Sequence, residues 1–236
     1  PQGRQHGGDV APVDVGNAAV GLEQVDDVVV QHAAVHELDR RNPDPFLEYL
    51  GGAGVVAAVG PAADIAVMGA PTDEGSPFMP GSRFGSRSIR EHSLRFGANG
   101  YFDHDTDKVF LKYELDNNRI VDVGDADVVP ADVKGTFENI TNLTRMVLDS
   151  GAMPVVLGGD HAITFPVVRA YNKPLHVVHF DAHIDYSPFI HGFEYTNSHA
   201  FRHIHHMDHV KSLTQVGIRS IRNNKAWIDD SINDGN

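Results

Sequence analysis

The stretch LHVVHFDAHID, residues 175–185, determines the fold prediction, because an apolar run leads directly into an alternating Asp-His-Asp pattern. An earlier stretch, MPVVLGGDH at residues 153–161, repeats the arrangement of an apolar run followed by polar residues. Short apolar runs of this length are typical of buried strands in a parallel sheet. Ligands bind outside the carboxyl ends of such strands, so we expect both polar segments to face one crevice.

The surrounding sequence alternates short apolar runs with helical stretches from Asp64 onward, which indicates stacked βα units around a mainly parallel sheet. The predicted fold class is therefore α/β. One helix is expected to bend at Pro166 and another to end at Gly151. We predict strands over residues 65–69, 120–123, 153–157, 175–180 and 213–218, and helices over residues 86–96, 137–147 and 162–171.

The first 63 residues differ in composition from the rest of the chain, since they are rich in Ala, Val, Gly and Asp and the first lysine is Lys108. Their small and β-branched residues follow neither a helical nor a strand period. We treat residues 1–63 as an N-terminal extension, for which three readings stay open: an ordinary extension, a linker, or a poorly determined part of the sequence. Residues 64–236 form the expected α/β domain.

Length and composition indicate one globular unit, because 236 residues with 41% apolar side chains suffice to bury a core. No run approaches the roughly 18 consecutive apolar residues of a membrane span, and the N-terminus lacks the pattern of a secretory signal. We therefore expect a cytoplasmic protein without a membrane partner.

The histidines and the charged residues limit the possible partners. The chain has no cysteine and 15 histidines, so any metal must be held by imidazole and carboxylate groups. A formal net charge of -13 disfavours nucleic acid, whose binding rests on Lys and Arg side chains that neutralise phosphates. An acidic surface is compatible with a small cationic substrate, although acidic side chains also serve solubility alone.

Asp181, His183 and Asp185 alternate directly after a predicted strand. If the backbone stays extended, their side chains face one side, with about 6–7 Å between successive Cα atoms. One carboxylate can then bridge two metal ions, which lie about 3.5–4 Å apart in dinuclear sites. The alternative is a polar strand end with an Asp that caps the next turn. His161 follows another strand of the predicted sheet and reaches the same edge, which favours the metal site.

Together, GGDH (residues 158–161) and DAHID (residues 181–185) resemble the first two of three metal-ligand signatures of the ureohydrolases, the arginase/agmatinase family. The resemblance covers residues 64–236 and implies an arginase-like three-layer sandwich around a mainly parallel sheet. It also implies hydrolysis of a guanidinium group to urea and an amine.

Two further segments are similar to the agmatinase branch of this family. They are PGSRFG (residues 80–85), followed by Ser86 in place of a proline, and NSHAFR (residues 197–202), with Ala200 in place of a glycine. The branch implies agmatine, or a related guanidino compound such as guanidinobutyrate, as the substrate. A third departure is Arg202, which comes one residue earlier than in the branch pattern. These departures concern the substrate and not the chemistry.

The resemblance implies a pair of metal ions held by named side chains. One ion would be bound by His161, Asp181 and Asp185, and the other by His183 with Asp181 as the bridge. Asp185 would also orient the hydroxide that acts as the nucleophile. The mixed imidazole and carboxylate set favours two manganese ions, with zinc or nickel as alternatives.

The loop after the second signature would complete the site. By the same resemblance, His199 would pass a proton to the departing amine and Asn197 would bind the substrate. The family also implies a homo-oligomer, a trimer or a hexamer.

The third family signature, a Ser-x-Asp-x-Asp strand, does not occur between Asp185 and Asn236. We therefore expect residues 64–236 to form a partial ureohydrolase domain that lacks the C-terminal strands. The alternative function is a catalytically silent fragment or binding subunit with the same fold. A metal-dependent deacetylase on a related fold is a third reading, which the agmatinase-like residues 80–90 disfavour.

Overall fold

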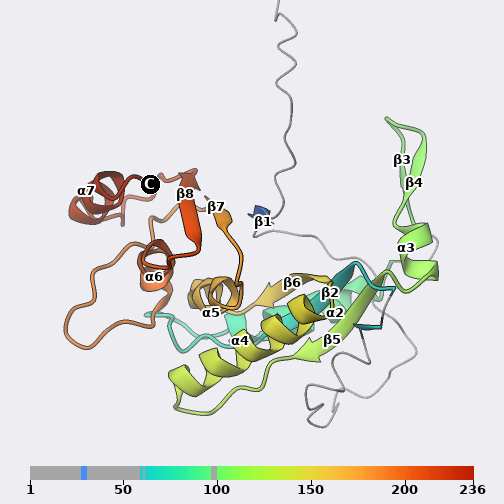
Figure 1. The fold of residues 1–236 in the computed structure, drawn as a ribbon, viewed down its shortest axis with the longest axis horizontal. Helices are drawn as coiled ribbons and strands as arrows, with labels where there is room; N and C mark the ends of the chain where they lie inside the picture. Colours follow the sequence, from blue (N-terminus) through green and yellow to red (C-terminus); the bar gives the residue numbers. More distant parts are fainter. Residues whose placement is uncertain (1–27, 31–58, 61, 97–99) are drawn as a thin grey trace, which may run out of the picture.

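The computed structural model describes residues 28–30, 59–60, 62–96 and 100–236, so most of the predicted extension lies outside the described residues. Two three-stranded parallel sheets occupy the centre, and an antiparallel hairpin projects away from them (Figure 1). The hairpin is followed by a short helix; these elements are β3 (Tyr101–Asp103), β4 (Lys108–Phe110) and α3 (Lys112–Asp116). Within these ranges, no helix has the length and apolar character that crossing a membrane requires.

The first sheet lies between two helices, which gives three layers. Its strands, in sheet order, are β5 (Ile120–Asp125), β2 (Ile65–Ala70) and β6 (Met153–Gly158). Ala66 and Met68 of β2 are buried in a core that they share with α4 (Val133–Asp149). Gly69 faces the other side, where a Cβ atom would lie only 3.0 Å from the Cβ of Ser86 in α2 (Gly85–Ser93).

The long helix α4 forms where the sequence places apolar residues at helical spacing. Phe137, Ile140 and Val147 are all buried against the first sheet. Asp132 caps the N-terminus, because its carboxylate accepts a hydrogen bond of 2.9 Å from the backbone N–H of Gly135. Gly151, with φ +90°, ends the helix in the left-handed conformation predicted for it.

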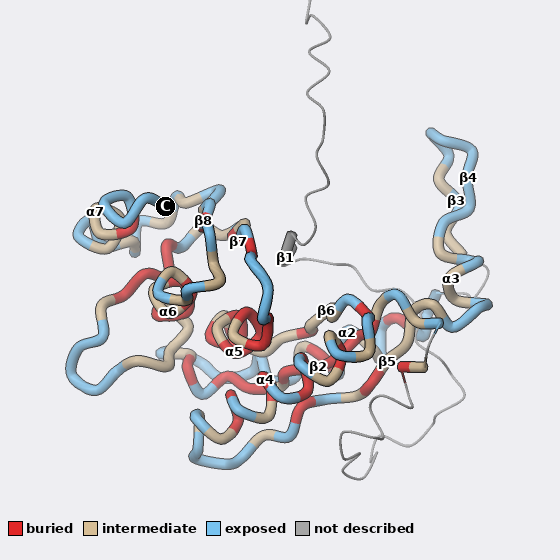
Figure 2. The backbone as a smooth tube through the Cα atoms, in the orientation of Figure 1, coloured by how far each residue is buried: buried red, intermediate tan, exposed pale blue. Residues whose placement is uncertain are grey.

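The second sheet carries the other half of the core. Its strands are β1 (Val28–Val30), β7 (Leu175–Phe180) and β8 (Val210–Val216). Leu175 and Leu213 pack with Phe201 and Ile204 of α6 (Ala200–His205), and all four side chains are buried. The buried segments in Figure 2 run through α5 (Thr164–Arg169), which contacts both α4 and α6, so α5 joins the two halves. The last helix is α7 (Lys225–Asn233).

The predicted α/β class is confirmed, and two local predictions are wrong. The chain after β6 forms a short 3-10 turn, His161–Ile163, and only then the helix α5 (Thr164–Arg169). Pro166 therefore stands in the first turn of α5, where its missing N–H has no helical partner to lose. The strand β8 begins at Val210, three residues before the predicted start.

Arg90 ties α2 to the end of β5. Its Nε atom donates to the Asp122 carboxylate at 2.7 Å, and its guanidinium also pairs with Asp125 and with the Gly124 carbonyl oxygen at 3.1 Å. The two Asp residues thus serve the packing of α2 on the sheet.

Gly85 provides a test of how tightly α2 packs on β6. A Cβ atom at this position would lie 2.3 Å from the carbonyl oxygen of Gly158, a backbone atom that cannot move freely. We expect Gly85→Ala to lower the free energy of unfolding by about 1–3 kcal/mol, measured by urea denaturation. The control Ser88→Ala, at an exposed position of the same helix, should stay within about 0.5 kcal/mol of the wild type. Equal stability of the two variants would show that α2 has room to move.

Candidate metal centre

An imidazole and two carboxylates meet where β6 and β7 end. The Nδ1 atom of His161 lies 2.9 Å from Oδ2 of Asp181 and 2.8 Å from Oδ2 of Asp185. His161 follows β6, and both Asp residues follow β7, so the contact joins the two halves of the molecule. Two carboxylates held this close repel each other unless a positive charge lies between them.

Asp181 occupies the middle of this group. Its Oδ1 atom accepts a hydrogen bond of 2.9 Å from the backbone N–H of His183 and lies 3.3 Å from the His183 Nδ1 atom. One carboxylate oxygen of Asp181 therefore faces His161 and the other faces His183. The His183 side chain is half exposed, at 50%, so it is open to solvent on its other side.

The backbone reaches this arrangement by a route that the sequence did not predict. The strand β7 stops at Phe180, and Asp185 adopts a left-handed conformation with φ +43°. The expected extended backbone through Asp185 is therefore wrong. Asp tolerates this conformation better than most residues, and the turn carries the Asp185 carboxylate back toward His161.

The structure adds a fourth side chain, His179, which the sequence analysis overlooked. His161, His179, Asp181 and Asp185 each offer one potential ligand atom, and these atoms lie within 4.8 Å of one another. The signal was its position two residues before Asp181, which places both side chains on one face of a strand. The apolar neighbours of this histidine in residues 175–180 mask that signal, because they indicate a buried strand.

Charge interactions between His161 and the two carboxylates hold this group together. Burial lowers the pKa of His161, but its hydrogen bonds with Asp181 and Asp185 and their charges outweigh this and raise the pKa to about 9. Burial alone would raise the pKa of Asp181, yet the hydrogen bonds from His161 and from the His183 backbone hold it below its usual value. The pKa of His179 falls to about 3, chiefly through burial and then through the charge of His161. A protonated His161 thus occupies the place of a cation.

The turn that presents His161 is fixed by backbone contacts. Gly159 has φ +73°, and a Cβ atom there would lie 2.3 Å from the carbonyl oxygen of Ala70, so only glycine fits. Its N–H donates to the Ser82 carbonyl at 3.1 Å, and the N–H of Asp160 donates to the Thr72 carbonyl at 2.9 Å. The Asp160 carboxylate accepts from the backbone N–H of Ala162 at 2.8 Å and caps the turn.

A second buried carboxylate, Asp73, organises the neighbouring loop. It accepts hydrogen bonds from the Arg83 side chain at 2.5 Å and from the backbone N–H groups of Gly81 at 2.6 Å and Arg83 at 3.2 Å. These bonds, that of the Arg83 side chain first, lower the pKa of Asp73 to about 2. The agmatinase-like segment 80–85 is thereby held beside the His161 turn.

His199 and Asn197 lie on the loop before α6. The His199 side chain is buried, with Nδ1 2.7 Å from the Thr196 hydroxyl and Nε2 3.3 Å from the Pro188 carbonyl oxygen, and burial lowers its pKa. Both ring nitrogens are thus engaged within the loop itself. The backbone N–H of Asn197 donates to the Gly75 carbonyl at 3.2 Å, which brings this loop against the segment that supports Asp160.

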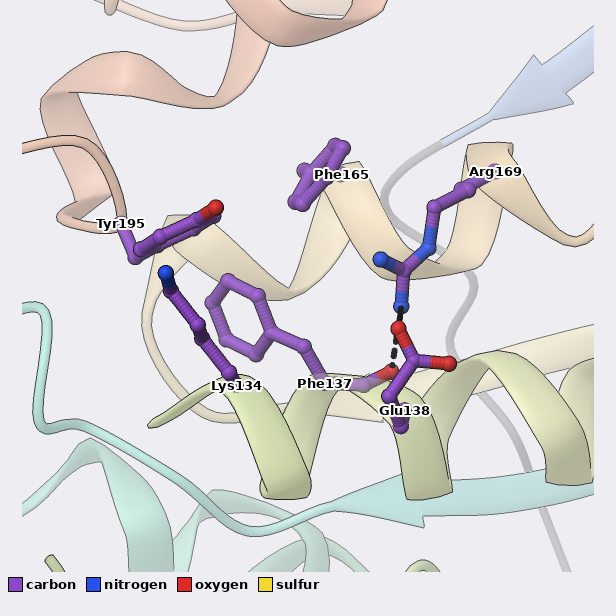
Figure 3. A pocket seen from close by; sticks show the side chains of 6 residues that line it. All are labelled: Lys134, Phe137, Glu138, Phe165, Arg169 and Tyr195. Atoms are coloured by element: carbon purple, nitrogen blue, oxygen red, sulfur yellow. Dashed lines mark hydrogen bonds and ion pairs between the residues drawn. The ribbon is translucent and has the colours of Figure 1, made fainter. Parts of the chain in front are cut away.

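Aromatic rings anchor the same loop. The His203 ring stacks on Phe165 at 4.2 Å and on Tyr195 at 5.3 Å, and its Nε2 atom lies 2.6 Å from the Glu194 carbonyl oxygen. Beside this stack is a pocket of about 100 Å³, into which Phe165 and Tyr195 point from α5 and from the loop (Figure 3). It is lined by Lys134, Phe137, Glu138, Phe165, Arg169 and Tyr195. None of these residues is a candidate metal ligand. The pocket is therefore part of the packing that supports the loop, and not part of the metal centre.

The chain resembles known proteins over most of the described residues. The family model described as the Arginase family matches residues 63–233. An uncharacterized 32.2 kDa protein of Methanothermus fervidus is 36% identical over 155 residues, which are 65% of this chain and 51% of that protein. Proclavaminate amidinohydrolase of Streptomyces clavuligerus is 33% identical over 161 residues, 66% of this chain and 49% of that enzyme.

Solved structures agree with this match. Arginase from Medicago truncatula superposes with a TM-score of 0.59 at 30% identity, covering 73% of this chain and 54% of that one. The chain spans about half the length of the curated relatives that it matches. Because the family match extends over well more than half of the sequence and includes both strands that deliver His161 and its two carboxylate partners, the chain belongs to the arginase family of ureohydrolases.

Proposed function

We propose that this chain contributes to a binuclear-metal amidinohydrolase that hydrolyses the guanidinium group of agmatine, or of a related guanidino compound, to urea and an amine. The observation that carries the proposal is the position of His161 between the carboxylates of Asp181 and Asp185. In a ureohydrolase fold, such a group at the carboxyl ends of the strands is where a ligand is expected.

The residues present fit divalent cations. Two carboxylates and an imidazole, already gathered around one point, form a hard and borderline donor set that suits manganese, with zinc or nickel as alternatives. We assign His161, Asp181 and Asp185 to one ion, and His183 with Asp181 to the other. When bound, two such ions make water a nucleophile at neutral pH and stabilise negative charge as it develops.

The protein groups around the ions would orient the substrate and move protons. The carboxylate of Asp185 would orient the attacking water by accepting a hydrogen bond from it. Asn197 is our candidate for contact with the substrate, and His199 for proton delivery to the leaving amine, which must depart neutral. The His199 ring would have to give up its contact with Pro188 to do so, and that contact is long, at 3.3 Å.

The substrate class rests on the relatives and on charge. Matching proteins include the putative agmatinase 1 of Schizosaccharomyces pombe and guanidinopropionase of Pseudomonas aeruginosa, which are named for agmatine and for a guanidino compound. A net charge of -13 favours the approach of a cationic guanidinium compound. We also propose a homo-oligomer, as the resemblance implies.

The test is urea release. The protein that carries this chain, at the full length its gene encodes, should release urea from agmatine or guanidinobutyrate when manganese is supplied, and Asp185→Asn should abolish the release. Formamide release from formiminoglutamate, without urea from any guanidino compound, would move the proposal to another amidine substrate. Metal binding without any hydrolysis would favour a silent binding subunit.

His199→Ala tests the proton-delivery role. We expect turnover to fall roughly ten- to a thousandfold, because general acid catalysis contributes on that order, while the bound metal per chain stays unchanged. Stopped-time urea assays and metal analysis of the purified variant provide the two measurements. His104→Ala, which alters a side chain that is 95% exposed, is the matched control and should retain wild-type turnover. Loss of metal from His199→Ala would instead make His199 a ligand or a structural residue.

The raised pKa of His161 predicts how metal uptake depends on pH. In the metal-free chain, the stability that comes from its charged form is complete below the ordinary pKa of 6.5 and is lost as pH rises through about 9. A metal ion must displace this proton. Binding near pH 7 should therefore release about one proton, and the affinity should increase as the pH approaches 9. Calorimetry in two buffers of different ionisation enthalpy measures the release; an affinity that is constant over this range would refute the assignment of His161 as a ligand.

A further inference from the structure

The group around His161 contains one histidine more than the proposed metal site uses. His179 is buried, and its Nε2 atom lies 3.6 Å from Oδ2 of Asp181, so distance alone would admit His179 as a ligand. Whether it can bind a metal depends on which ring nitrogen carries the proton, because a coordinating imidazole nitrogen must be unprotonated. The surrounding hydrogen bonds decide this.

Gln215, the β8 residue opposite His179 in the sheet, has only one consistent amide orientation. Its Nε2 atom lies 2.7 Å from the carbonyl oxygen of Ile184, which can only accept, so a nitrogen must stand there. Its Oε1 atom accepts from the Ser231 hydroxyl of α7 at 2.8 Å, in agreement with this orientation. The amide of Gln215 is therefore fixed from two sides.

The fixed amide determines the tautomer of His179. The Nε2 atom of Gln215 lies 2.9 Å from Nδ1 of His179 and presents its second N–H there. Nδ1 must accept this bond, so it carries no proton, and the proton of the imidazole stands on Nε2. That atom is buried and makes no hydrogen bond within the described part of the chain, and a carboxylate oxygen of Asp181 lies 3.6 Å away from it.

Packing holds the ring in this direction. Phe201 stacks on His179 with ring centroids 3.6 Å apart and an interplanar angle of 18°, and the His161 ring meets it edge-on at 4.9 Å. An imidazole with an unprotonated Nε2 would carry its proton on Nδ1, and this N–H would then face the N–H of Gln215. The cost of that contact opposes ligation by His179.

We propose that Gln215 locks His179 as the Nε2–H tautomer, which directs this N–H toward the Asp181 carboxylate 3.6 Å away, makes His179 a positioning residue and excludes it from the metal ligands. The inference rests on the proposed metal site for the role of Asp181, but the tautomer itself does not. His183, on the other oxygen of Asp181, remains the second histidine ligand. The chain Ser231, Gln215, His179 and Asp181 thus connects α7 to the metal centre through side-chain contacts.

The tautomer is measured first, on the metal-free 236-residue chain, by long-range proton–nitrogen NMR of the histidine rings. We expect His179 to show a protonated Nε2 and an unprotonated Nδ1. Gln215→Glu replaces the donor by an acceptor and should reverse the pattern, whereas His176→Gln, at an exposed histidine of the same strand, should leave it unchanged. An unprotonated Nε2 in the wild type would overturn the proposal. This measurement does not depend on whether any variant folds.

Zinc, which is diamagnetic, then probes the role of His179. A glutamine side chain retains an N–H donor near the Nε2 position, so His179→Gln should bind zinc within about threefold of the wild type. His179→Leu, which has no donor, should bind about ten- to a hundredfold more weakly. Equal loss in both variants, or a zinc-induced change of His179 Nε2 to a coordinated nitrogen, would make His179 a ligand and overturn the proposal. Zinc binding by the wild type decides the proposed metal site separately from the tautomer.

Discussion

Two carboxylates share one imidazole where the two halves of the molecule meet, and the rest of the structure depends on this contact. Asp181 and Asp185 approach the same nitrogen of His161 at 2.9 and 2.8 Å. Carboxylates this close are stable only with positive charge between them, which in the metal-free chain is the proton of His161. The first sheet with its helices carries the imidazole, and the second carries both carboxylates, so neither half makes the site alone.

The positions of these groups are fixed by backbone atoms more than by side chains. Gly159 must be a glycine because the Ala70 carbonyl leaves no space for a Cβ atom, and Gly85 must be one because of the Gly158 carbonyl. Asp73 and Asp160 are buried carboxylates that accept hydrogen bonds from backbone N–H groups, and these bonds hold the loops on either side of His161. These packing contacts and hydrogen bonds keep the ligand atoms in position before a metal ion binds.

Most of the fold and part of the site could be predicted from the sequence. The apolar runs before His161 and Asp181 identified β6 and β7, because buried parallel strands leave a continuous apolar pattern. The left-handed turn at Asp185 could not be predicted, since Asp is compatible with an extended backbone as well. The role of His179 could not be predicted either, because Gln215 lies 36 residues further on and becomes its neighbour only when β7 pairs with β8.

The pairing of β7 with β8 also limits which histidines of this site can bind a metal ion. One carboxylate oxygen of Asp181 faces His161 and the other faces His183. A third histidine, His179, lies near the oxygen that faces His161. If all three rings offered unprotonated nitrogens, the site would admit several arrangements of metal ions. The proposed proton on Nε2 of His179 removes one of these arrangements. Gln215 is not itself a ligand, but its fixed amide therefore reduces the number of ways in which a metal ion can bind.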